Sequence, residues 1–141
     1  MSIQAVLSPL FAQVMLTFVL MYWMAFLRTT ALTGGEIGYG DVALREQKWP
    51  TRCTQIANAF HNQLELPVLF YVLTILVGTS GQADLAFVIM AWVFVMLRIV
   101  HAAIHVTTNN VRQRGAIFGL SALVLTAMWV LFMLRVMFAA P

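Results

Sequence analysis

The sequence predicts an all-α integral membrane protein, a bundle of four transmembrane helices. Of its 141 residues, 62% are hydrophobic and only 9% are charged, and the mean hydropathy is +0.88. A soluble domain has about 45–50% apolar and about 25% charged residues. Four apolar stretches reach the roughly 20 residues that a spanning helix needs; they cover residues 8–27, 56–78, 84–106 and 116–138. No period-two alternation suggests a barrel, and the length fits one domain over residues 1–141.

The first apolar stretch is interpreted as a spanning helix, not as a cleaved secretory signal. The residues before it lack the positive charges of a signal peptide, and its apolar run is longer than that of a cleaved one. The segment that follows, residues 28–55, is the longest non-apolar one. Its Gly34-Gly35 pair predicts a turn, and Trp49-Pro50 is typical of a membrane interface before a helix that starts near Thr51.

Polar residues lie inside the second stretch, where a membrane helix is usually apolar. Asn58, Asn62 and Glu65 are four and three residues apart, which places them on one face of a helix. Ionisable groups at membrane depth cost several kcal/mol unless they are paired or hydrated, so they commonly face the bundle interior. Pro67 cannot donate to the carbonyl of Gln63, so a kink is expected here, either an ordinary one or one that shapes a site.

A second polar stripe ends the third stretch. Arg98, His101 and His105 are three and four residues apart, and in a continued helix Thr108 and Arg112 would share their face. This stripe runs toward the third loop, which follows the third stretch. The stripe of the second stretch starts from the first loop, which precedes the second stretch. Both stripes therefore lie at the same end of the bundle, and we expect one polar site between the second and third spans.

Positive charges predict the orientation in the membrane. They gather in the first loop (Arg28, Arg45, Lys48, Arg52) and in the third (Arg112, Arg114), whereas the second loop and both tails have none. By the positive-inside rule these two loops are cytoplasmic and both termini lie outside. Arg135, near the end of the fourth stretch, would then reach the outer interface. The net charge of +3 is small and divided between loops, so we expect membrane lipid and no nucleic acid as a partner.

Two segments carry a resemblance to a known family. Residues 62–67 (Asn-Gln-Leu-Glu-Leu-Pro) and residues 98–105, which run from an arginine to two histidines, are followed by residues 109–114 (Asn-Asn-Val-Arg-Gln-Arg). They resemble the MAPEG family, the membrane-associated proteins in eicosanoid and glutathione metabolism, and its short bacterial members in particular. The resemblance covers the whole chain. It implies a homotrimer in a bacterial inner membrane, with glutathione as co-substrate, a lipophilic small molecule as possible substrate, and sites between subunits that open toward the cytoplasm.

The resemblance also implies roles for particular residues. Asn62 and Glu65 match positions that contact glutathione. His101 and His105 match a pair that lines the same site, with tyrosine common at the second position, and Arg98 joins this candidate binding set.

An arginine after the third span is thought to stabilise the glutathione thiolate in this family. Arg114 fits that spacing best and is the candidate catalytic residue, with Arg112 close to it in the binding set. The chemistry is reasonable, because a guanidinium near the sulfur would lower the pKa of the thiol. Arginines can also hold the carboxylates of glutathione, and Glu65 can accept from its ammonium group.

The chain departs from the family pattern at two positions. Members that bind glutathione usually carry an arginine four residues before the motif asparagine, and here that residue is Asn58. His105 stands where tyrosine is expected. Arg52 precedes Asn58 by about 9 Å along the helix axis, at 1.5 Å per residue, and is therefore too far away to replace the missing arginine. One carboxylate clamp is therefore missing.

Three interpretations of the polar site remain open. The first is a glutathione-dependent transferase or peroxidase that acts on lipophilic electrophiles. The second is a non-catalytic trimeric scaffold or accessory subunit, in which Glu65 pairs with Arg98 or His101 only to neutralise buried charge. The third is a metal site, because His101 and His105 repeat the spacing of His61 and Glu65. Structural histidines are the commoner case, so no metal ligands are assigned.

Overall fold

The computed structural model of the chain describes residues 1–44 and 48–138. Every regular element in this part is helical, which confirms the all-α class. The elements are α1 (Ile3–Thr33), η1 (Tyr39–Val42), α2 (Thr51–His61), η2 (Asn62–Leu64), α3 (Leu66–Thr79), α4 (Leu85–Val106) and α5 (Val111–Phe138), where η marks a short 3-10 helix. The α2, η2 and α3 helices form one interrupted span, so the described residues contain four helices that can cross a membrane, as predicted.

The first helix is longer at both ends than the apolar stretch that predicts it. At its start, the Ser2 hydroxyl accepts from the Ala5 N–H at 3.3 Å and caps the helix. At its end, the Gly34 N–H bonds to the Thr30 carbonyl at 2.8 Å, and Gly35 turns the chain with a φ of +75°. At about 45 Å, α1 is longer than the bilayer core is thick. Arg28 therefore lies on the helix and not in the first loop.

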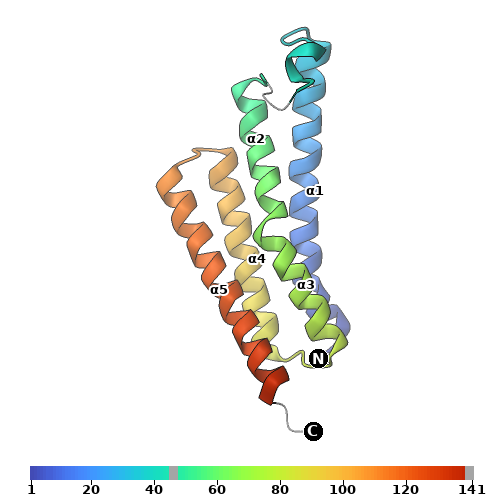
Figure 1. Ribbon diagram of the computed structural model, residues 1–141, viewed down its shortest axis with the longest axis vertical. Coiled ribbons are helices and arrows are strands. Elements are labelled where there is room, and N and C mark those ends of the chain that lie inside the picture. The colour runs from blue at the N-terminus through green and yellow to red at the C-terminus, as the bar shows by residue number, and fades with distance from the viewer. Residues whose placement is uncertain (45–47, 139–141) are drawn as a thin grey trace.

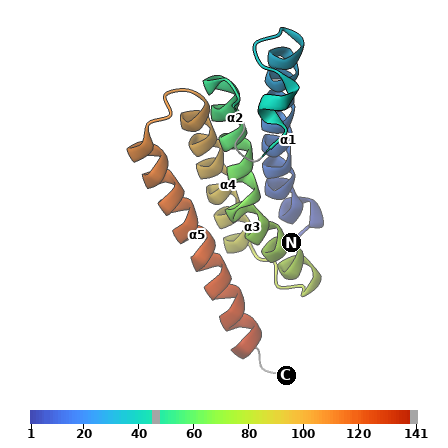
Figure 2. The same cartoon turned by 45° about the horizontal axis from the view of Figure 1, so that its top comes forward.

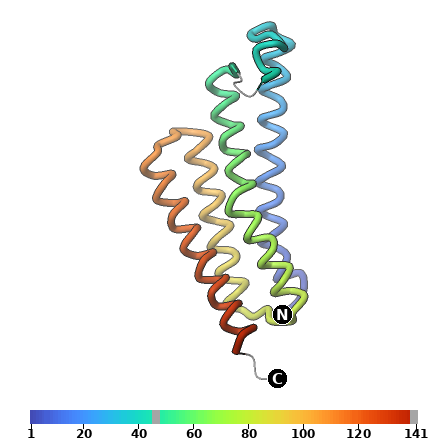
Figure 3. The backbone as a smooth tube through the Cα atoms, viewed as in Figure 1, coloured from blue at the N-terminus to red at the C-terminus, as the bar shows by residue number. Residues whose placement is uncertain are grey.

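The helices run up and down beside one another (Figure 1). The first loop and the short third loop lie at one end of the bundle, and both termini lie with the second loop at the other end (Figure 3). The basic residues named above for the first and third loops therefore share one end, apart from Arg45, which lies outside the described residues. Figure 2 shows α5 beside α4, on the side away from α1.

Apolar packing joins the helices in two clusters. One contains Val6, Phe70 and Phe94, the last two with ring centroids 4.8 Å apart, and lies toward the termini. The other contains Leu20, Ile56 and Ala102 and lies between α1, α2 and α4. Many large apolar side chains point outward on every span. They imply contact with lipid, so the clusters are held mainly by van der Waals packing between the helices.

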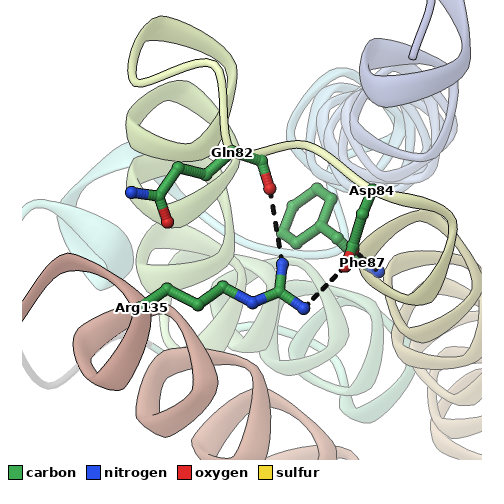
Figure 4. A network of polar contacts seen from close by, with 4 residues as sticks. All are labelled: Gln82, Asp84, Phe87 and Arg135. Atoms are coloured by element: carbon green, nitrogen blue, oxygen red, sulfur yellow. Dashed lines mark hydrogen bonds and ion pairs between the residues drawn. The ribbon is translucent and has the colours of Figure 1, made fainter. Parts of the chain in front are cut away.

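An ion pair joins α5 to the start of α4 at the end that carries the termini (Figure 4). The Arg135 guanidinium lies 2.6 Å from an Asp84 carboxylate oxygen and also donates to the Gln82 carbonyl at 3.4 Å. The other Asp84 oxygen accepts from the Phe87 N–H at 2.8 Å, which caps α4. The sequence interpretation, in which Arg135 simply reaches the interface, overlooked this acidic partner.

Candidate functional site

The polar stripe of the second span lies at a break in the helix. Regular α2 ends at His61, η2 continues to Leu64, and Glu65 has φ −97° and ψ −106°, outside the helical region. Pro67 stands in the first turn of α3, where its missing N–H costs nothing. The expected kink is therefore a full interruption, and it begins one turn before the proline.

A buried glutamine pair supports this interruption. The Gln13 side-chain amide on α1 donates to the Gln63 side-chain oxygen at 2.9 Å, and Gln63 in turn donates to the Ala59 carbonyl at 3.1 Å. Both glutamines are fully buried. Their bonds hold the interrupted segment against α1. The sequence analysis missed the pair, although a single glutamine in each of two apolar stretches was a signal that could have identified it.

Asn62 connects the two polar stripes. Arg98 on α4 is fully buried, and its guanidinium donates to the Asn62 carbonyl at 3.1 Å and to the Asn62 side-chain oxygen. The Asn62 side-chain amide then donates to the Glu65 carboxylate at 3.2 Å. The expected direct contact of Glu65 with Arg98 or His101 is not formed among the described residues of this chain, where Glu65 is exposed. The Asn62 side chain stands between the two charges.

The two histidines of α4 lie together behind this chain of contacts. His101 and His105 are 2% and 5% exposed, and their ring centroids lie 5.7 Å apart in an edge-on arrangement. The ring of His101 also lies 5.9 Å from Phe118 of α5. His61, in contrast, is exposed. Among the described residues, no three His, Cys, Asp or Glu side chains gather closely enough to hold a metal ion.

The third loop brings a second guanidinium to the same place. Because α4 ends at Val106 and α5 begins at Val111, the connection is short, and Asn109 adopts a left-handed φ of 52°. The Asn110 side chain accepts from the N–H groups of Arg112 and Gln113 at 3.0 and 3.2 Å and caps α5. The Arg114 guanidinium donates to the Asn109 side chain.

The interrupted second span, α4 and α5 line an open cleft of about 260 Å³. The lining residues come from η2, the Glu65 junction, α4 and α5: Asn62, Glu65, His101, Val111, Arg114, Gly115 and Phe118. The structure thus brings together four of the predicted site residues, with Arg98 buried behind Asn62. The cleft presents one carboxylate and one guanidinium beside an aromatic ring, so it suits a small polar molecule with charges of both signs.

Other predicted residues lie outside the cleft lining. His105 is buried one turn beyond His101, and Arg112 is exposed on the first turn of α5. The expectation that Thr108 and Arg112 continue the stripe of α4 is wrong, because that helix ends at Val106. Phe118, which the sequence analysis did not consider, stands four residues after Arg114. That spacing on a helix was the signal that could have identified it.

Comparison with known proteins gives one match. The family model described as "MAPEG family" matches residues 6–134 of the chain, which includes every residue of the cleft. No curated protein and no solved structure matches the sequence or the fold.

Proposed function

The chain belongs to the MAPEG family, and we propose that it is a glutathione-dependent transferase or peroxidase that acts on lipophilic electrophiles. The observation that carries this proposal is the cleft in which Glu65 and Arg114 face one volume together with Asn62 and His101. These two charges match the ammonium group and the anionic groups of the tripeptide.

Each lining residue receives a role from its chemistry. The Glu65 carboxylate accepts hydrogen bonds from the glutathione ammonium, and Asn62 holds that carboxylate in place through its own amide. The Arg114 guanidinium is the catalytic group, because a cation beside the sulfur favours the thiolate, which is the nucleophile. Arg98 supplies a fixed positive charge behind Asn62. His101 and Phe118 form the wall of the cleft.

The second substrate is a lipophilic electrophile that reaches the cleft from the bilayer. The spans expose large apolar side chains to lipid, so such a molecule dissolves in the bilayer around the protein. We propose a bacterial inner membrane from the resemblance to short bacterial members, and we propose that both termini lie outside from the charge distribution of the loops. We also propose a homotrimer, in which a neighbouring subunit covers the open side of the cleft.

A non-catalytic scaffold is the second candidate, and one observation favours it. Asn58, where glutathione-binding members carry an arginine, is neutral and exposed. The only guanidinium among the described residues of the cleft lining is that of Arg114. Because Arg114 is assigned to the sulfur, the carboxylates of glutathione have no guanidinium partner in that lining. On this view, the contacts of Asn62 serve only to accommodate the buried charge of Arg98.

The proposal is tested by isothermal titration calorimetry, in which glutathione is titrated into the solubilised protein. We expect the wild type to bind and Glu65→Gln to weaken binding about tenfold or more, because a charge-assisted hydrogen bond contributes about 1.5–3 kcal/mol. The matched control is Glu36→Gln, which neutralises an exposed carboxylate in the first loop and should bind like the wild type. No binding by the wild type would reject the enzyme in favour of the scaffold.

A further inference from the structure

The first two turns of α2 hold the carboxyl end of α4. The Arg52 guanidinium donates to the Val106 carbonyl at 2.5 Å, and the Gln55 side-chain amide donates to the carbonyls of His105 and Thr107 at 2.8 and 3.3 Å. Arg52 also donates to the Gln55 side-chain oxygen at 3.0 Å, so the two side chains act as one unit.

These bonds satisfy groups that a helix leaves without partners. The last carbonyls of an α-helix have no intrahelical donor, and a cation at this end interacts favourably with the helix dipole. The Arg52 guanidinium is itself held in place, because it lies 5.1 Å from the centre of the Trp23 ring on α1. The contact thus connects three helices at the end of the bundle that carries the cleft.

The position of this contact links it to the cleft. Gln55 precedes Asn62 on the same span by about two turns, and the carbonyl that it binds belongs to His105, one turn beyond His101. After Thr107, a short loop leads to α5, which begins at Val111 and carries Arg114 in its first turn. Any sliding of α4 along α2 would therefore move His101 and Arg114 relative to Asn62 and Glu65.

We propose that Arg52 and Gln55 are positioning residues, which set the axial register of α4 against α2 and thereby the distance between the Glu65 and Arg114 sides of the cleft. The effect on ligand affinity rests on the proposed glutathione function, whereas the effect on register does not. Arg52 and Gln55 touch no residue of the cleft lining through their side chains in the described bonds; they act through the backbone of α4.

The test combines glutathione titration with NMR of the histidine rings. The chain has three histidines, of which His101 reports on α4 and α5 through the nearby Phe118 ring, whereas exposed His61 is an internal reference. We expect Arg52→Met and Gln55→Met to shift the signals of His101 and His105 but not of His61. Each should weaken glutathione binding about tenfold, which corresponds to about 1.4 kcal/mol.

Two further variants separate positioning from general damage. Arg52→Lys keeps a cation that can donate to the Val106 carbonyl and should restore binding to within about threefold of the wild type. Lys48→Met removes an exposed cation at the same end of the bundle and should change nothing. If Arg52→Met does not fold, Gln55→Met carries the test, because it leaves the stacking on Trp23 intact.

Unchanged histidine signals in both methionine variants would overturn the proposal, even if binding fell. If the wild type binds no glutathione, the proposed function fails, but the histidine shifts still decide whether Arg52 and Gln55 set the register.

Discussion

Asn62 is the residue on which the candidate site depends most, because it bonds to both buried and exposed charges. Arg98 is fully buried, and its hydrogen bonds within the described chain go to the carbonyl and side chain of Asn62. A buried guanidinium that loses an acceptor bears the cost of its desolvation without compensation. This asymmetry makes a small polar side chain important to stability.

Asn62→Ala should therefore lower the free energy of unfolding by about 1–3 kcal/mol, the cost of leaving a buried polar group without its partner. The matched control is Gln4→Ala, which removes a side-chain amide at an exposed position near the start of α1, where we expect an effect within about 0.5 kcal/mol. Thermal and denaturant unfolding in detergent measure both. Equal effects of the two variants would show that the Arg98 contact contributes nothing specific.

The sequence could predict which polar residues lie near one another, but it could not predict which of them form hydrogen bonds with each other. Spacing placed Asn62 and Glu65 on one face and Arg98 and His101 on another, and the structure brings both faces to one place. Regular helix geometry carried the prediction to that point. The backbone then departs from a helix at Glu65. The Glu65 carboxylate is exposed, and the side-chain oxygen of Asn62 accepts from the guanidinium.

At the scale of the elements, the positions of the helix ends decide which residues can act together. The sequence pattern predicted four spans, because apolar length is a strong signal. It also placed the end of the third span at residue 106, where α4 ends. It did not predict what ends the helix there, since the polar stripe keeps its helical spacing up to Arg112. Asn109 in a left-handed conformation and Asn110 as a cap end the pattern through turn chemistry.

The contact between Asp84 and Arg135 gives a prediction about helix ends and pH. The hydrogen bond from Arg135, and then that from the Phe87 N–H, hold the pKa of the Asp84 carboxyl below its usual range. A lowered pKa favours the ionised form in the folded state, so its stabilisation is present above about pH 4 and is lost as the pH falls below that. The side chains of Arg135 and Asp84 are 40% and 42% exposed, so the ion pair contributes at most about 1 kcal/mol to stability.

We therefore expect Asp84→Asn to lower the free energy of unfolding by up to about 1 kcal/mol at neutral pH. The variant should also lose less stability than the wild type as the pH falls below about 4, the pKa of an ordinary aspartate. Asparagine can still cap α4, whereas Asp84→Ala also loses the bond to Phe87 and should cost about 1 kcal/mol more. Urea unfolding across this pH range measures both effects. Identical behaviour of the two variants would exclude a capping role for Asp84.

At the scale of the whole molecule, the ends of the bundle differ in charge, and this predicts its orientation. The first and third loops lie together at the basic end, while Ser80 belongs to the opposite end. In a background in which Cys53, the single cysteine of the sequence, is replaced by alanine, we expect Ser80→Cys to react with an impermeant thiol reagent from outside the cell. Thr108→Cys should react only after the membrane is opened. The reverse labelling pattern would invert the proposed topology.

The exposed polar residues of the second span predict the state of assembly. Asn58, His61 and Glu65 are all exposed, although they belong to an apolar span, Thr51–Thr79. In a monomer these groups would meet lipid at considerable cost, whereas a neighbouring subunit could cover them and complete the open side of the cleft. Buried polar contacts between subunits are thus a physical reason for the proposed homotrimer.

Native mass spectrometry of the protein in detergent should give a homotrimer. Asn58→Trp should shift the distribution toward smaller species, because a large side chain at a packed polar face forces the subunits apart. Leu123→Trp is the matched control: it adds the same ring on α5, where the apolar side chain of Leu123 is 69% exposed, and it should remain trimeric. Detection of the wild type as a stable monomer or dimer, without trimer, would contradict the proposed homotrimer. The exposed polar residues of the second span would then have to be covered by water that enters from the basic end, and the cleft would have to bind its ligand with the residues of one chain.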